Sequence, residues 1–330
     1  MFSWQATPLR PLTLLGMLIG VVVVLALVLG IVTYLIYFER KVIGWMQGRI
    51  GPNRVGPLGL LQSVADVLKL LIKEDIIPAN ADRALFLLAP VIAFVPSFMV
   101  LAVIPYTASH IFTANLNVGL LYYIALSSLT ILGIVMAGWA SNNKYSLLGG
   151  MRSAAQMISY EIPLGLSVLG VVMLAGSLNL VTIVQHQSTD RFGWYIIPQI
   201  IGFVVFMIAA LVELNRTPFD LPEAESELVA GYFTEYSGFR FAFFMLSEYV
   251  YVFAISALAT TLFLGGWAGP FLPSWLWFAI KTSAIIFFLF WVRATMPRMR
   301  GDQLMSFAWK VLIPVALFNV VLTGALSLIG

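Results

Sequence analysis

The chain contains eight long apolar runs, and these constrain its fold more than any other feature. The runs cover residues 12–38, 84–106, 117–139, 157–178, 196–214, 240–264, 275–295 and 306–328. Each run is long enough to cross a hydrocarbon core of about 30 Å at 1.5 Å per helical residue. Only 10% of the residues are charged, whereas a soluble domain carries about 25%. The sequence therefore predicts an all-α polytopic membrane protein, with residues 1–330 forming a single membrane domain.

The basic residues indicate how the chain is oriented. Fifteen of the eighteen lysines and arginines lie in residues 39–83, 140–156, 215–239 and 293–310 or at Arg240, where a span begins. Loops that are rich in lysine and arginine face the cytoplasm. Because eight spans return the chain to its starting side, both termini are expected on the opposite face of the membrane.

Residues 58–74 are predicted to form a helix that is too short to cross the membrane. Its polar residues, Gln62, Asp66, Lys69 and Lys73, are spaced four, three and four residues apart. They therefore form one polar stripe beside a wide apolar face. This pattern is typical of a helix that lies in the plane of the membrane interface. The alternative is a helix whose apolar face packs against other subunits.

The acidic residues are concentrated in one short segment. Six of the fifteen lie within residues 211–238, namely Glu213, Asp220, Glu223, Glu225, Glu227 and Glu235. Most of this segment belongs to the loop 215–239, which we expect on the cytoplasmic face. A dense acidic segment where water meets the bilayer indicates that the chain handles protons or cations there.

Three glutamates lie inside predicted spans. Glu161, Glu213 and Glu248 are each expected within roughly 12 Å of the cytoplasmic boundary, counted at 1.5 Å per residue. A charge at bilayer depth costs at least about 2.5 kcal/mol, and burial and mutual repulsion favour the neutral form of a carboxyl group. We therefore expect a shared hydrated cavity in which these groups exchange protons near neutral pH. The alternative is simple pairing with arginines at the cytoplasmic ends of the spans.

Two further contacts can be predicted from position along the spans. Glu213 and Arg216 are three residues apart, and residues at this spacing meet on one face of a helix. Lys281 lies six residues into the run 275–295, near the outer face. We expect Lys281 to extend its ammonium group toward the aqueous interface, as long basic side chains do near helix ends.

Several classes of function are excluded by what the sequence lacks. There is no cysteine, so the chain holds no thiolate-ligated iron–sulfur cluster and no disulfide. There is no glycine-rich phosphate-binding motif of the GxGxxG or GxxxxGK type. We expect no metal site, no haem, no nucleotide and no nucleic acid bound by this chain alone.

Five motifs occur in order along the chain. They are FERKVIGWMQGRIGPNRVGPLGLLQSVADVLKLLIKED, GWASNNKYSLLGGMRSAAQMISYE, ELNRTPFDLPEAESELVAGYFTEYSG, SEY and RATMPRMRGDQLM. Together they resemble the H subunit family of bacterial NADH:quinone oxidoreductase (respiratory complex I), which includes mitochondrial subunit 1. The resemblance covers nearly the whole chain. It implies a protein of the bacterial inner membrane with both termini on the periplasmic side, whose helices two to six resemble half of an antiporter-like module.

The resemblance also implies roles for particular residues. The subunit forms the membrane-side entrance and much of the chamber for the quinone, and it links quinone reduction to proton translocation. The implied proton path includes Glu161, Glu213, Glu248, Glu223, Glu225, Glu227 and Asp66. The implied quinone chamber includes Arg40, Arg49, Arg216, Arg293 and Asp220. NADH, FMN and the iron–sulfur clusters belong to partner subunits, and the implied partners are other membrane-arm subunits and the quinone-site subunits of the peripheral arm.

Three other functions remain open. The chain could be the equivalent subunit of a membrane-bound hydrogenase or another donor-linked dehydrogenase, which the absence of NADH- and flavin-binding partners would reveal. It could be a stand-alone cation carrier, which would show ion flux in liposomes. It could be a passive anchor, in which case neutralising its acidic residues would leave turnover unchanged.

Overall fold

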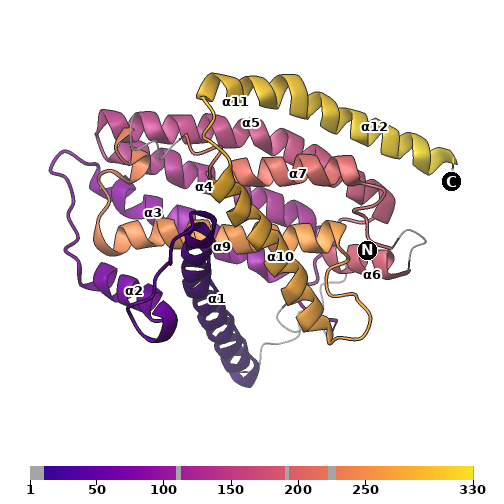
Figure 1. Ribbon diagram of the computed structural model, residues 1–330, viewed down its shortest axis with the longest axis horizontal. Coiled ribbons are helices and arrows are strands. Elements are labelled where there is room, and N and C mark those ends of the chain that lie inside the picture. Colours follow the sequence, from indigo (N-terminus) through magenta and orange to yellow (C-terminus); the bar gives the residue numbers. More distant parts are fainter. Residues whose placement is uncertain (1–10, 109–112, 190–192, 222–227, 330) are drawn as a thin grey trace.

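The computed structural model describes residues 11–108, 113–189, 193–221 and 228–329, and this part of the chain contains helices and turns but no strands (Figure 1). The α-helices are α1 (Pro11–Met46), α2 (Gln62–Ile72), α3 (Arg83–Met99), α4 (Gly119–Ala140), α5 (Lys144–Ala175), α6 (Leu180–Thr189), α7 (Ile200–Glu213), α9 (Gly238–Phe263), α10 (Ser274–Thr295), α11 (Gly301–Phe307) and α12 (Ile313–Ile329). Short 3₁₀ turns lie at η1 (Pro57–Gly59), η2 (Val100–Val103) and η3 (Gly231–Phe233), and a π-helical turn, η4 (Ala308–Leu312), joins α11 to α12. The predicted all-α class is confirmed.

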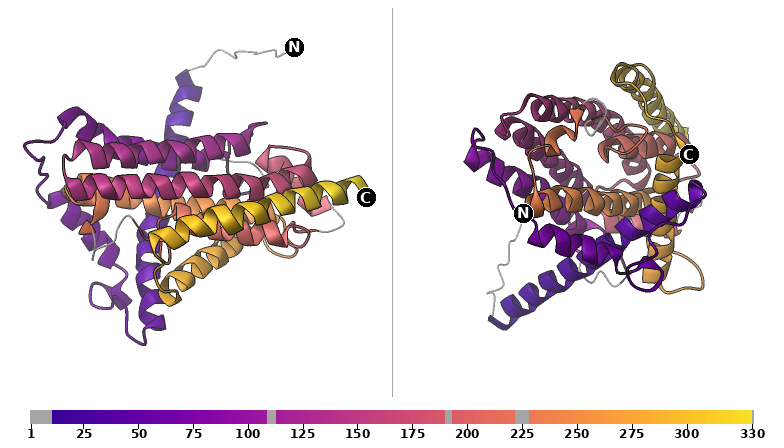
Figure 2. Two further views of the ribbon diagram at one scale, coloured as in Figure 1. Left: turned by 90° about the horizontal axis from the view of Figure 1, so that it is seen from above. Right: turned by 60° about the vertical axis from the view of Figure 1, so that its left-hand side comes forward.

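The long helices form a bundle with two oblique members. α4, α5, α7 and α9 run side by side, α12 lies over α5 and α7, and α1 and α10 cross the bundle at a steep angle (Figure 1 and Figure 2). Small residues allow close approach: a Cβ on Gly133 of α4 would lie 2.7 Å from the backbone nitrogen of Ala93 on α3. Such contacts are the usual means of packing membrane helices, because lipid provides no hydrophobic force between them.

Six described helical segments are long and apolar enough to cross a membrane. They are Arg83–Val103, Gly119–Ala140, Lys144–Ala175, Gly238–Phe263, Ser274–Thr295 and Gly301–Leu328. The two remaining predicted spans correspond to α1, which has 36 residues, and to α7, which has 14. The chain is a multi-pass membrane protein.

The helix α7 is shorter than the predicted span 196–214. It has 14 residues and is about 21 Å long at 1.5 Å per residue. Pro198 lacks an N–H and disfavours the helical conformation in the residue before it, and Gln199 has a non-helical φ of −114°. At the other end, Asn215 adopts a left-handed conformation with φ of 49°. These two positions limit the helix to Ile200–Glu213.

The helix α5 is longer than predicted. It starts at Lys144 rather than at residue 157, so most of the predicted loop 140–156 is helical. Asn143 caps its start, because the Asn143 side chain accepts a hydrogen bond from the Tyr145 N–H at 2.9 Å. Glu161 is therefore 17 residues from the start of the helix (161 − 144), or about 25 Å along its axis.

The segment predicted to lie in the membrane interface is helical over a shorter range than the predicted 58–74. Leu58 has a positive φ of 56°, and a Cβ on Gly59 would lie 2.2 Å from the carbonyl oxygen of Pro52. The chain therefore turns tightly at these residues, and α2 begins only at Gln62. The predicted boundaries are wrong, while Asp66 and Lys69 lie within the helix.

Candidate functional site

A row of buried charges begins at Glu39 on α1. The Glu39 side chain is 2% exposed and forms ion pairs with Arg293, in the last turn of α10, and with Arg216, which follows α7, at 3.6 Å. Removing a carboxylate from water costs several kcal/mol unless opposite charges compensate for the lost hydration. Two guanidinium groups, one from α10 and one from the segment that follows α7, provide that compensation and connect these elements to α1. Glu39 was not among the predicted site residues.

Arg216 continues the row toward α9. Its guanidinium lies 3.4 Å from a carboxylate oxygen of Glu248 and 4.7 Å from the ring centre of Tyr249. The hydroxyl of Tyr232, in η3, donates a hydrogen bond to Glu248 at 3.3 Å. Glu248 lies ten residues into α9 (248 − 238), and its side chain is 12% exposed. Arg216 therefore bridges two buried carboxylates, Glu39 and Glu248.

The predicted contact between Glu213 and Arg216 is replaced by these pairs. The prediction assumed that both residues lie on one helix. α7 ends at Glu213, and Asn215 turns the chain into the left-handed region before Arg216 is reached. The helical spacing therefore does not apply, and Arg216 pairs with Glu39 and Glu248.

Glu213 faces a small cavity that it shares with Glu248. The cavity has a volume of about 30 Å³, and Tyr232, Tyr251 and Thr130 also line it. A cavity of this kind needs about 10–15 Å³ to hold one water molecule, so this one has room for one or two. The hydroxyl of Tyr251 is buried beside this cavity.

Glu161 lies beside the same group of residues. The hydroxyl of Ser128, on α4, donates a close hydrogen bond to Glu161 on α5. Glu161 and Glu213 are near enough for their carboxylates to repel each other. The structure therefore brings the three predicted intramembrane glutamates together: Glu213 and Glu248 line one cavity, and Glu161 lies next to Glu213.

The other predicted residues are arranged differently. Asp66 forms an ion pair with Arg40 at 2.5 Å and accepts a hydrogen bond from Gln62 at 3.0 Å. Both members of this pair are partly exposed, and the pair fixes α2 to α1. Arg49 is exposed in the turn that follows α1, and Asp220 is half-buried in the segment that follows α7. Glu223, Glu225 and Glu227 lie outside the described residues.

An apolar groove lies between α1 and α10. It has a volume of about 610 Å³, and Gly30, Ile31, Tyr34, Phe38 and Ile286 are among the residues that line it. The ring of Phe38 contacts those of Phe287 and Phe290, with ring centres 6.5 and 6.2 Å apart. Phe38, which lines the groove, directly precedes Glu39 in α1.

The prediction for Lys281 is wrong. Its side chain is buried and donates hydrogen bonds to the carbonyl oxygens of Leu264, Gly266 and Ala268 at 2.7, 3.1 and 2.6 Å. The ammonium group also lies 4.6 Å from the ring centre of Trp194. A cation is favourable at a helix C-terminus, where carbonyl groups lack partners. Lys281 therefore caps α9 from α10 instead of reaching water.

Comparison with known sequences identifies the family. A sequence profile described as NADH dehydrogenase matches residues 19–324. The chain belongs to the NADH dehydrogenase family. It is 67% identical over 317 residues to the H subunit of the NADH-quinone oxidoreductase of Brevibacillus brevis, covering 94% of this chain and 93% of that protein. It is 66% identical over 311 residues to the protein of the same name from Bacillus mycoides, covering 93% of this chain and 92% of that protein. The predicted resemblance to H subunits is confirmed.

Proposed function

We propose that the chain is the membrane subunit of an NADH-quinone oxidoreductase in which quinone enters and protons are moved in response to its reduction. The names of its relatives support membership of this complex. The charged residues from Glu39 to Glu161 support the assignment of a quinone path and a proton path to neighbouring parts of the subunit. In this proposal the chain is not catalytic alone. NADH, FMN and iron–sulfur clusters are held by partner subunits, and quinone is the substrate that meets this chain.

The quinone path follows the groove between α1 and α10. A quinone has a long apolar tail and a polar headgroup, and the groove offers apolar side chains along its length, with Phe38, one of its lining residues, next in sequence to Glu39. In this proposal the tail lies along α1, and the headgroup passes Phe38 toward Glu39 and Arg293. Arg40, Arg49, Arg216 and Asp220 complete the chamber together with the peripheral-arm subunits.

The proton path starts where the quinone path ends. Two unit charges 4 Å apart interact by about 4 kcal/mol at an effective dielectric constant of 20, and 1.36 kcal/mol changes the protonation equilibrium of a carboxyl group tenfold. A change of charge beside Glu39 therefore alters how strongly Arg216 is held by Glu39 and by Glu248. In this proposal Glu248, the water in the cavity, Glu213 and then Glu161 pass the proton on. Asp66 and the glutamates at 223, 225 and 227 extend the path.

The location and partners follow from the same assignment. We propose that the chain lies in a bacterial cell (inner) membrane as one membrane domain, with the basic loops in the cytoplasm and both termini on the opposite, periplasmic side. Its partners are the other membrane-arm subunits and the quinone-site subunits of the peripheral arm.

The observation that carries the proposal is the bridge formed by Arg216 between the carboxylates of Glu39 and Glu248.

The proposed quinone path along the groove is tested by a substitution that fills the groove. Gly30 lines it, and a Cβ at this position has no neighbour within 4 Å, so Gly30→Trp adds bulk at a position where the first side-chain carbon meets no neighbour. We expect the KM for a long-tailed quinone to rise roughly tenfold, equivalent to about 1.4 kcal/mol, while oxidation of NADH by an artificial acceptor is unchanged.

The matched control is Gly20→Trp, because Gly20 also lies on α1 with no neighbour within 4 Å but does not line the groove. Equal KM values for Gly30→Trp, Gly20→Trp and the parent would contradict the assigned quinone path. Purification of the complex without NADH- and flavin-binding subunits would favour the hydrogenase-type alternative. Ion flux by this chain alone in liposomes would favour a cation carrier.

A further inference from the structure

Gln156, on α5, is a buried polar residue that the quinone and proton paths described above do not use. Its side chain is 0% exposed. The Nε2 group donates hydrogen bonds to the carbonyl oxygen of Val212 at 3.0 Å and to the carbonyl oxygen of Phe219 at 2.8 Å. Val212 lies in the last turn of α7, and Phe219 lies in the segment that follows α7. Gln156 therefore joins the two ends of the turn that contains Arg216.

The orientation of the Gln156 amide is determined by these two partners. A backbone carbonyl oxygen only accepts hydrogen bonds, and a primary amide nitrogen has two N–H groups to donate. The amide nitrogen must therefore face both carbonyl groups. Its contact with the Oδ1 atom of Asn215 is longer, at 3.3 Å. An apolar side chain at position 156 would leave both carbonyl groups without this donor, and the turn would lose the connection between its ends.

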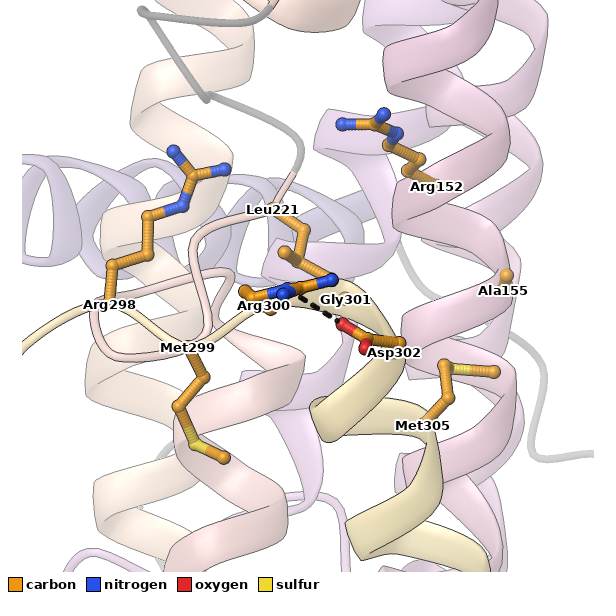
Figure 3. A pocket seen from close by; sticks show the side chains of 9 residues that line it. All are labelled: Arg152, Ala155, Leu221, Arg298, Met299, Arg300, Gly301, Asp302 and Met305. Carbon is orange, nitrogen blue, oxygen red and sulfur yellow. Dashed lines mark ion pairs between the residues drawn. The ribbon is translucent and has the colours of Figure 1, made fainter.

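The segment that follows α7 lies along α5. The ring centre of Phe219 is 6.2 Å from that of Tyr160, and Leu221 lines a pocket together with Ala155, the neighbour of Gln156 (Figure 3). Residues four apart share one helix face, so Gln156 and Tyr160 hold this segment against one face of α5.

The position of this turn determines the contacts of the Arg216 guanidinium. The backbone N–H of Phe219 donates to the carbonyl oxygen of Arg216 at 2.9 Å, so the residue that Gln156 holds is itself bonded to Arg216. The guanidinium lies 3.6 Å from Glu39 and 3.4 Å from Glu248. A misplacement of about 1 Å can lower the rate of a reaction roughly 100-fold. A displaced turn would therefore weaken the bridge between the two carboxylates.

We propose that Gln156 is a positioning residue for quinone reduction, because it holds the turn that keeps Arg216 in contact with Glu39 and Glu248 at the same time. Gln156 lines neither the groove along α1 nor the cavity of Glu213. It therefore acts through Arg216 and not on the quinone or on the transferred proton. This inference rests on the bridging role proposed above for Arg216.

The test combines Gln156→Met with Arg216→Gln in a double-mutant cycle on the assembled complex in membranes. Met is an unbranched side chain of similar length that lacks the N–H donors. Quinone turnover is normalised to NADH oxidation by an artificial acceptor, which measures assembly. We expect Gln156→Met to lower kcat roughly tenfold, within the roughly 100-fold that a small misplacement can cost, and to leave the KM for quinone unchanged. In the Arg216→Gln background it should cause no further loss, because effects that share one interaction are not additive.

Gln187→Met is the matched control. Gln187, on α6, is also buried, and its Nε2 group donates to the carbonyl oxygen of Thr261, on α9, at 2.9 Å. This substitution should leave normalised kcat unchanged. Gln156→Asn keeps the amide donors on a side chain that is shorter by one methylene, so it should retain more of kcat than Gln156→Met. If the Gln156→Met complex does not assemble, Gln156→Asn takes its place in the cycle.

Three results would overturn the positioning role and leave the proposed function standing. The first is a normal kcat in Gln156→Met together with slow turnover in Arg216→Gln. The second is the same relative loss from Gln156→Met in the parent and in the Arg216→Gln background, which would show that Gln156 does not act through Arg216. The third is an equal loss in Gln187→Met, which would show a general effect of removing a buried amide. Normal quinone reduction by Arg216→Gln would instead refute the bridge itself.

Discussion

Replacing Arg216 should disconnect Glu39, which lies beside the proposed quinone path, from Glu248, which begins the proposed proton path. Arg216 lies 3.6 Å from Glu39 and 3.4 Å from Glu248. At an effective dielectric constant of 20, each contact corresponds to roughly 5 kcal/mol of attraction before desolvation is subtracted. Glu39 keeps Arg293 as an ion-pair partner, and Glu248 keeps the hydrogen bond from Tyr232. Removing one member of a buried pair costs about 3–5 kcal/mol, and we expect Arg216→Gln to lower the free energy of unfolding by this amount.

The functional result separates a relay from a structural contact. We expect Arg216→Gln complexes that assemble to reduce quinone at least tenfold more slowly, while NADH oxidation by an artificial acceptor is retained. Arg216→Lys keeps the charge, but an ammonium group cannot hold two carboxylates in the planar geometry of a guanidinium or stack in the same way on Tyr249. It should recover part of the stability and part of the turnover. Normal quinone reduction by Arg216→Gln would refute the proposed bridge.

Two further predictions concern parts of the fold outside the row. Lys281→Met should lower the free energy of unfolding by about 2–4 kcal/mol, because the carbonyl groups of Leu264, Gly266 and Ala268 lose a charged donor. Lys310→Met, at an exposed position, should change it by less than about 0.5 kcal/mol; equal effects in detergent unfolding would contradict the capping role. In membranes, a cysteine at position 66 should react with a water-soluble maleimide and one at position 67 should not, because α2 is proposed to lie in the interface. Equal reactivity would refute that orientation.

Much of the architecture could be predicted because membrane helices are set by length and apolarity. The segments 240–264 and 275–295 correspond within a few residues to α9 and α10. The start of α5 was missed because residues 144–156 contain several polar and glycine residues. That segment is helical because Asn143 caps it and because its glycines face other backbone atoms; a Cβ on Gly149 would lie 2.6 Å from Gly231. Those contacts are between distant parts of the chain and leave no local signal.

The sequence predicted which residues belong to the site better than it predicted which of these residues form contacts with one another. Glu161, Glu213 and Glu248 could be singled out because carboxylates are costly inside a membrane, and the structure places them together. Glu39 lies in a basic segment at the end of α1, where a charge needs no special explanation, so its burial was not foreseen. The partner of Arg216 depended on the left-handed Asn215, which helical spacing cannot represent. Asparagine is one of the few residues that adopts this conformation readily, and its presence before Arg216 was the available signal.

The central claim is that Glu213 exchanges protons during turnover, and Glu213→Gln tests it most directly. The substitution keeps the shape of the side chain and removes the exchangeable proton. Glu235→Gln is the matched control, because Glu235 accepts a hydrogen bond from Asn143 at 2.6 Å and does not line the cavity of Glu213. The measurement is NADH:quinone turnover together with proton translocation in membranes, with NADH oxidation by an artificial acceptor as the measure of assembly. For Glu213→Gln we expect near-normal assembly and a loss of coupled turnover of roughly 100-fold, which is the lower end of the range for removal of a proton-transfer group. Glu213→Asp should retain partial activity, and Glu235→Gln should have normal activity. A Glu213→Gln complex that turns over and pumps normally would contradict the proposed role of Glu213 in the proton path.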